Sequence, residues 1–181
     1  DHPLTGPRGA QAPHGWRTNS KGPDASVHSS RLGPRMRIGI TYINIGETKT
    51  SINHQQLSYE LSEKINFKKG MQLALNNIGV AYLNNDLLNK ALTYFLRSLK
   101  IVEETQNYSS VASLYYNCAL IYRRTNDLKK STEFLYKAKH YAAVQKNNEL
   151  LIMANSNLST NFRNMNQMDS ARFYSNIAGK L

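Results

Sequence analysis

LNNIGVAY at residues 75–82 returns in altered form as YYNCALIY at 115–122 and as NSNLSTNF at 155–162. Each copy ends in an aromatic residue, and the step from one copy to the next is 40 residues. A fixed period in this range is typical of proteins that stack one small structural unit on the next. The repeat therefore predicts an elongated molecule that works through a surface, and it argues against a chain built around a catalytic pocket.

The composition of the chain changes near Met36. All five prolines lie in the first 34 residues, whereas all eleven tyrosines follow residue 35. Residues 1–35 contain too few large apolar side chains to offset the entropy of ordering them, so we expect a disordered arm rich in proline and glycine. An expression leader or a mistranslated upstream stretch would explain the foreign composition, with Met36 as the native start.

Apolar residues recur at helical spacing within each copy. Leu75, Ile78 and Tyr82 fall on one face of a helix that we expect over residues 70–84. A turn cluster of asparagine and aspartate follows, and then a second helix over residues 88–105. Each repeat is therefore predicted to be an antiparallel helix pair, and the fold class to be all-α.

This pattern resembles the tetratricopeptide repeat family. The family motif has a small residue one turn before an aromatic residue on the first helix, then a small, a bulky and a small residue on the second. The three copies supply Gly79, Tyr82, Ala91, Phe95 and Ser98; Ala119, Tyr122, Ser131, Leu135 and Ala138; and Ser159, Phe162, Ala171, Ser175 and Ala178, where Ser175 departs from the bulky residue. Small residues let the two helices approach, and the aromatic ring fills the gap beside them. The resemblance implies a right-handed solenoid of about 3.5–4 repeats.

The expected units lie near residues 36–69, 70–108, 109–148 and 149–181. The first is the weakest copy, because Ser51 and Gln55 stand where the motif has small and bulky apolar residues, and Gly46 interrupts the turn. Long periods of this kind occur in the kinesin light chain group and in bacterial regulators with repeat sensor domains, which the composition also resembles. No polar cap is evident before Leu181, so residues 168–181 are a short cap or the chain is a fragment of a larger regulatory protein.

An asparagine recurs opposite the apolar stripe, as Asn77, Asn117 and Asn157. The resemblance places the first helix of each pair on the concave wall, so these amides are expected to face the groove, as in the asparagine ladder of the O-linked N-acetylglucosamine transferase superhelix. An amide offers a donor and an acceptor to the backbone of an extended peptide, although a solvated asparagine is the simpler alternative. The complete predicted peptide-binding set is Asn77, Asn84, Asn117, Arg123, Arg124, Asn157, Arg163 and Asn164.

The chain is basic, with a net charge of +11, of which +8 belongs to residues 36–181. Arginines beside the groove amides favour an acidic peptide or a chain-terminal carboxylate as partner, and ordinary surface charge near a helix end is the alternative. Nucleic acid is a weaker hypothesis, because the basic residues are scattered and most tyrosines belong to the core stripe. Self-association through the apolar ends of the solenoid is a third hypothesis.

No constellation for catalysis is evident. The sequence lacks a glycine-rich phosphate loop and a nucleophile elbow, and His54 and His140 have no cysteine or carboxylate at metal spacing. Cys118 lies in the core stripe, where a small buried hydrophobe is expected. No apolar run approaches the length of a membrane span and no signal-peptide pattern opens the chain, so the cytoplasm is the default expectation. The leading hypothesis is a non-catalytic scaffold, without metal or cofactor, that binds an extended peptide.

Overall fold

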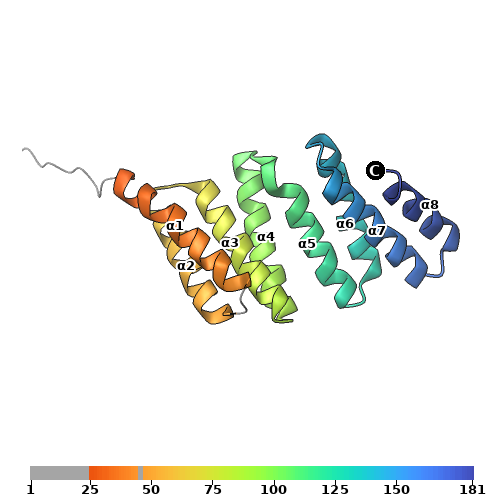
Figure 1. Ribbon diagram of the computed structural model, residues 1–181, viewed down its shortest axis with the longest axis horizontal. Coiled ribbons are helices and arrows are strands. Elements are labelled where there is room, and N and C mark those ends of the chain that lie inside the picture. Colours follow the sequence, from red (N-terminus) through yellow and green to blue (C-terminus); the bar gives the residue numbers. More distant parts are fainter. Residues whose placement is uncertain (1–24, 45–46) are drawn as a thin grey trace, which may run out of the picture.

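The computed structural model describes residues 25–44 and 47–181. Within these ranges the α-helices are α1 (Ala25–Asn44), α2 (Thr48–Lys64), α3 (Lys68–Asn84), α4 (Leu88–Thr105), α5 (Val111–Arg124), α6 (Leu128–Val144), α7 (Asn148–Asn164) and α8 (Met168–Ala178), with one 3₁₀ turn, η1 (Tyr108–Ser110). Figure 1 shows the helices side by side in chain order, from α1 at one end to α8 at the other. The prediction of an all-α solenoid is confirmed.

The 40-residue repeat is built from two halves of 20 residues each. A residue with positive φ stands near the end of each half, at Asn66, Asp86, Gln106, Asn126, Lys146 and Asn166. This left-handed conformation is unfavourable for most L-residues, but asparagine and aspartate tolerate it because their short side chains bond locally. The Asn- and Asp-rich clusters therefore mark the helix boundaries, and α4 has the bounds that the sequence predicts.

The first helix begins earlier than the sequence predicts. Helix α1 starts at Ala25 and contains Pro34, so residues 25–35 are helical and do not belong to the predicted arm of residues 1–35. Helix α1 packs against α2 and also contacts α3. Such tertiary contacts stabilise a helix whose own sequence carries little periodicity. Residues 1–24 lie outside the described residues.

The first unit forms a helix pair in spite of its weak motif. Gln55 occupies the position of the bulky residue and is fully buried, and its Nε2 donates a hydrogen bond of 3.1 Å to the Met36 carbonyl oxygen. Gly39 makes room for it, because a Cβ there would lie 2.4 Å from the Gln55 amide nitrogen. A hydrogen-bonded contact between Gln55 and α1 thus replaces the apolar packing that the motif has at this position. Gly46 lies outside the described residues.

The close packing that the motif predicts is present in the later units. A Cβ on Gly79 would lie 2.6 Å from the ring of Phe95, which is fully buried. In the next two units a serine hydroxyl ties the pair together: Ser131 donates to the Ala119 carbonyl at 2.9 Å, and Ser159 donates to the Ala171 carbonyl at 2.7 Å. Small residues therefore bring the two helices of each pair into contact.

One recurring feature escaped the sequence analysis. Each unit brings two rings together, one from each helix of the pair: Tyr42 with His54, Tyr82 with Tyr94, and Phe162 with Tyr174 are stacked, and Tyr122 with Phe134 is tilted. The ring centroids are 5.1–5.6 Å apart. Lys90 lies over the Tyr82 ring and Lys130 over the Tyr122 ring, also at the 40-residue step. These two lysines therefore form cation–π contacts with the chain's own aromatic rings.

The two helices of a pair lie in different layers of the solenoid. The first helices contact one another in sequence, α1 with α3, α3 with α5 and α5 with α7, whereas successive second helices are not in comparable contact within the described residues. A solenoid curves toward the layer in which neighbours are closest. The first helices therefore form the concave wall. No helix in the described ranges is both long enough and apolar enough to cross a membrane.

Candidate functional site: the concave wall between α5 and α7

A hollow of about 270 Å³ lies on the concave wall between the third and fourth units. Its lining comes from α5 and from the beginning of α7, and consists of Ser113, Tyr116, Asn117, Asn147, Glu149, Leu150 and Met153. Asn147 also caps α7, because its side chain accepts a hydrogen bond of 3.0 Å from the Leu150 amide. The hollow therefore combines a fixed polar rim with apolar contacts from Leu150 and Met153.

Asn117 is the one member of the predicted asparagine row whose amide is free. Its side chain is half-buried in the wall of the hollow, and no hydrogen bond to it is found within the described residues. An unpaired amide has two donor hydrogens and an acceptor oxygen available. Asn117 thus lies where the sequence predicts a peptide-binding amide and retains the groups that such binding needs.

The other two asparagines of the row are bonded to neighbouring units. The Asn77 Nδ2 atom donates to the Gln55 Oε1 atom on α2 at 3.3 Å. The Asn157 amide donates to the Tyr116 hydroxyl at 2.9 Å and to the Met153 carbonyl at 2.8 Å, and it accepts a hydrogen bond from Arg123. The three amides share a register position, but the structure does not bring them together as a row of free groups.

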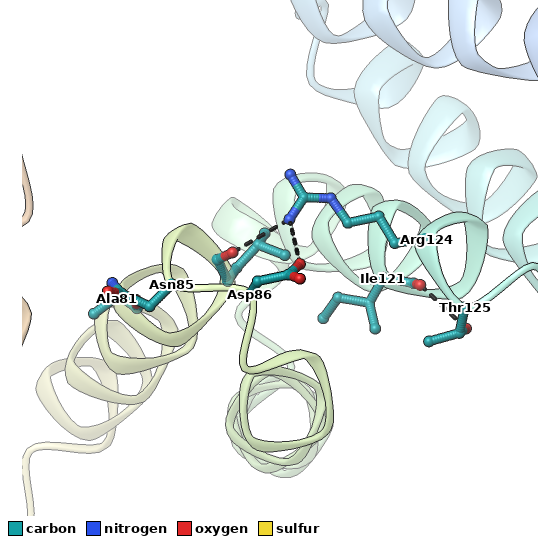
Figure 2. A network of polar contacts seen from close by, with 7 residues as sticks. Ala81, Asn85, Asp86, Ile121, Arg124 and Thr125 are labelled. Carbon is teal, nitrogen blue, oxygen red and sulfur yellow. Dashed lines mark hydrogen bonds and ion pairs between the residues drawn. The ribbon is translucent and has the colours of Figure 1, made fainter.

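Arg123 and Arg124 are adjacent in the sequence but contact different neighbours. Arg123 is half-buried and bonds Asn157 on the next first helix. Figure 2 shows that Arg124 extends instead toward the turn after α3, where it donates to the Leu83 carbonyl at 3.3 Å and pairs with Asp86 at 3.4 Å. The pair of Arg124 and Asp86 is exposed, so it contributes little to stability, but it fastens the turn of the second unit to α5.

The remaining predicted residues lie away from the hollow. Arg163 is exposed and lines a separate depression between α7 and α8, and Asn164 lies at another depression beside the turns. Asn84 is exposed at the end of α3. The predicted set therefore divides into Asn117, the pair of Arg123 and Asn157 beside it, and residues that the structure places elsewhere.

Two titratable side chains near this wall are held neutral. Burial raises the pKa of the Tyr116 hydroxyl, and the hydrogen bond from Asn157 and the charge of Arg123 oppose that rise in part. Burial alone raises the pKa of the Cys118 thiol to about 12, which removes its nucleophilic form near neutral pH. Within the described ranges no three His, Cys, Asp or Glu side chains gather as a metal site requires.

These features define the class of the protein as a helical-repeat solenoid with a polar concave wall. The model of the tetratricopeptide repeat family matches residues 70–139 of the chain. No curated protein matches the sequence.

Solved structures with the same fold have little sequence in common with this chain. The apo form of RapI has a TM-score of 0.76 at 15% identity, and the match covers 83% of this chain and 43% of RapI. A putative kinesin light chain of Podospora anserina has a TM-score of 0.70 at 15% identity, covering 83% of this chain and 74% of that one. The repeat domain of Arabidopsis FLU has a TM-score of 0.59 at 18% identity, covering 66% and 98%. These likenesses establish the fold.

Proposed function

We propose that this chain is a non-catalytic scaffold that binds an extended segment of a partner protein along the concave wall, with the hollow between α5 and α7 as its main contact. The observation that carries the proposal is the free amide of Asn117 in the wall of that hollow. A side-chain amide can bond both the N–H and the C=O of an extended backbone. Leu150 and Met153 add apolar contacts for a side chain of the same segment.

The partner segment must cross more than one unit. A single hydrogen bond contributes only about 0.5–1.5 kcal/mol net, so one amide alone gives negligible affinity. The neighbouring first helices α3 and α7 continue the same wall, and a segment that lies across them gains further contacts. A long, shallow binding surface of this kind is the characteristic mode of solenoid proteins.

The proposal includes an acidic partner and a regulatory setting. The excess of positive charge on residues 36–181 favours acidic segments over basic ones. A nucleic-acid partner is less favoured, because Lys90, Lys130 and Arg97 lie over the chain's own tyrosine rings, two of which, Tyr82 and Tyr94, stack with each other. The composition of the repeats supports a place in a regulatory protein, where the solenoid would dock a partner.

Fluorescence polarisation with a library of short, capped, labelled peptides tests the proposal. The wild-type chain should bind a subset of the library, and Asn117→Ala should weaken that binding about 2–10-fold, the equivalent of one lost hydrogen bond. Asn176→Ala, an exposed asparagine on α8, is the matched control and should leave binding unchanged. Equal binding by the wild type and Asn117→Ala would remove the hollow from the proposal, and a library without any binding peptide would remove the proposal itself.

A further inference from the structure

We infer that Arg123, together with the Tyr116 hydroxyl, forms an anion subsite that binds the carboxylate of an acidic side chain in the partner segment. This inference rests on the proposed function and adds the residues that select the chemistry of the segment. Arg123 and Tyr116 both project from α5, and the Asn157 amide on α7 joins them. The subsite therefore spans the third and fourth units, beside the hollow that holds Asn117.

The directions of the hydrogen bonds leave donor hydrogens unused on both Arg123 and Tyr116. The Asn157 Nδ2 atom lies 2.8 Å from the Met153 carbonyl oxygen, which can only accept, so the orientation of the amide is fixed. The Asn157 Oδ1 atom then accepts from Arg123, and the Nδ2 atom donates to the Tyr116 oxygen. Because the phenol oxygen accepts, its own hydrogen remains to be donated. Arg123 uses one of its five N–H donors in this contact, which leaves the others for a ligand.

Arg123 also lacks a counter-ion. No carboxylate pairs with it within the described residues, whereas the adjacent Arg124 pairs with Asp86 at 3.4 Å. Arg123 is half-buried, and a partly desolvated charge is costly unless a partner compensates it. An acidic side chain on the bound segment would supply that compensation.

A carboxylate fits these donors better than other groups of a peptide. A planar guanidinium bonds a carboxylate through two parallel N–H···O contacts, and these charge-assisted bonds are about twice as strong as neutral ones. Basic side chains are repelled, and an amide side chain accepts through a single oxygen and supplies no charge to balance the guanidinium. Asn157 acts as a positioning residue, because both of its polar atoms are used in holding Arg123 and Tyr116 in place.

The test uses three capped peptide libraries that are identical except for a fixed central residue, which is glutamate, glutamine or lysine. The wild-type chain should bind the glutamate library about tenfold more tightly than the glutamine library, and the lysine library least. The preference should decrease with added salt, since the contact is ionic. Arg123→Gln should abolish the difference between glutamate and glutamine, and Tyr116→Phe should reduce it.

Two variants separate the ionic contact from a structural role. Arg163→Gln changes the arginine at the same repeat position one unit later, which is exposed and bonds no asparagine among the described residues, so it should keep the wild-type preference. Arg123→Lys keeps the charge and should keep a preference for glutamate even if its binding is weaker. In the wild-type chain, the Nε–H resonance of Arg123 should shift on addition of the glutamate library but not the glutamine library.

The outcomes distinguish this inference from the proposed function. Equal wild-type binding to the glutamate and glutamine libraries would overturn the subsite and leave the peptide-binding scaffold standing. If Arg123→Gln keeps the preference for glutamate, and the Arg123 resonance of the wild-type chain does not shift, the glutamate carboxylate binds elsewhere. This result would overturn the subsite as well. If no library binds, the proposed function and the subsite both fail.

Discussion

The fit between Gly79 and Phe95 provides a direct test of how the repeats pack. A Cβ on Gly79 would lie 2.6, 2.7 and 3.0 Å from three atoms of the buried Phe95 ring, well inside ordinary contact distance. In the next unit the same two positions hold Ala119 and Leu135, both fully buried. The third unit thus combines a larger first residue with a smaller second one. Transferring that combination into the second unit should restore a fit that either change alone destroys.

The expected free energies follow from these contacts. Gly79→Ala gains about 1 kcal/mol of helix propensity but costs about 3 kcal/mol of overpacking, because a fully buried ring has no free space to move into. The single variant should therefore lose about 2 kcal/mol of stability. Phe95→Leu should lose about 1.5 kcal/mol through the removed ring volume. The double variant avoids the overpacking and should lie within about 1 kcal/mol of the wild type, so the coupling between the two changes is about 3 kcal/mol.

Urea unfolding followed by far-ultraviolet circular dichroism measures the free energy of unfolding of the wild type, the two single variants and the double variant, which together form a double-mutant cycle. The reciprocal change in the third unit, Ala119→Gly with Leu135→Phe, serves as the matched control and should also be tolerated. Additive losses in the double variant would refute the reasoning, because they would show that Gly79 and Phe95 do not meet as described. A stable Gly79→Ala single variant would refute it equally.

Two further predictions concern the turns and the core. Lys146 has a φ of 53°, a left-handed conformation that glycine adopts without strain, so Lys146→Gly should raise the free energy of unfolding by about 0.5–1 kcal/mol. Lys100→Gly, on the exposed face of α4, is the control and should lower the free energy of unfolding by about 1 kcal/mol. A loss of stability in both variants would contradict the turn geometry. Burial raises the pKa of Cys118 from 9.0 to about 12. Between these pH values the native thiol keeps its proton while the unfolded chain loses it, so stability should fall as pH rises, by about 1.4 kcal/mol per pH unit from this group. Cys118→Ala should show a flatter alkaline dependence in urea unfolding, and an unchanged slope would show that the thiol is not buried.

The regular part of the fold could be predicted because it depends on local rules. Asparagine or aspartate, which tolerates a left-handed conformation, stands at four of the six turns, and α4 begins at Leu88 and ends at Thr105 as predicted. The small and bulky positions of the second unit also pair as expected, at Gly79 and Phe95. The second-helix rings of Tyr94, Phe134 and Tyr174 recur at the same 40-residue step, and extending the comparison to the second helices would have found them.

The candidate site could be predicted only in part, because it depends on contacts between units that differ in sequence. A helical projection places Asn77, Asn117 and Asn157 on one face, but it cannot show that Gln55 bonds the first and Tyr116 the third. Gln55 and Tyr116 do not recur at the equivalent positions of the other units, so the 40-residue period could not predict these hydrogen bonds. The beginning of α1 was missed for a similar reason, since its packing against α2 and α3 stabilises a segment without a clear pattern.

The central claim is that a peptide binds to the concave wall between α5 and α7, and residue-resolved NMR of the complex tests it most directly. Titrating the tightest library peptide into ¹⁵N-labelled protein should shift the side-chain amide of Asn117 and the backbone amides around Ser113 and Met153, which line the hollow. Residues on the second helices, such as Arg97 on α4 and Lys139 on α6, should not respond. Shifts confined to the second helices, with the Asn117 amide unmoved, would contradict the account.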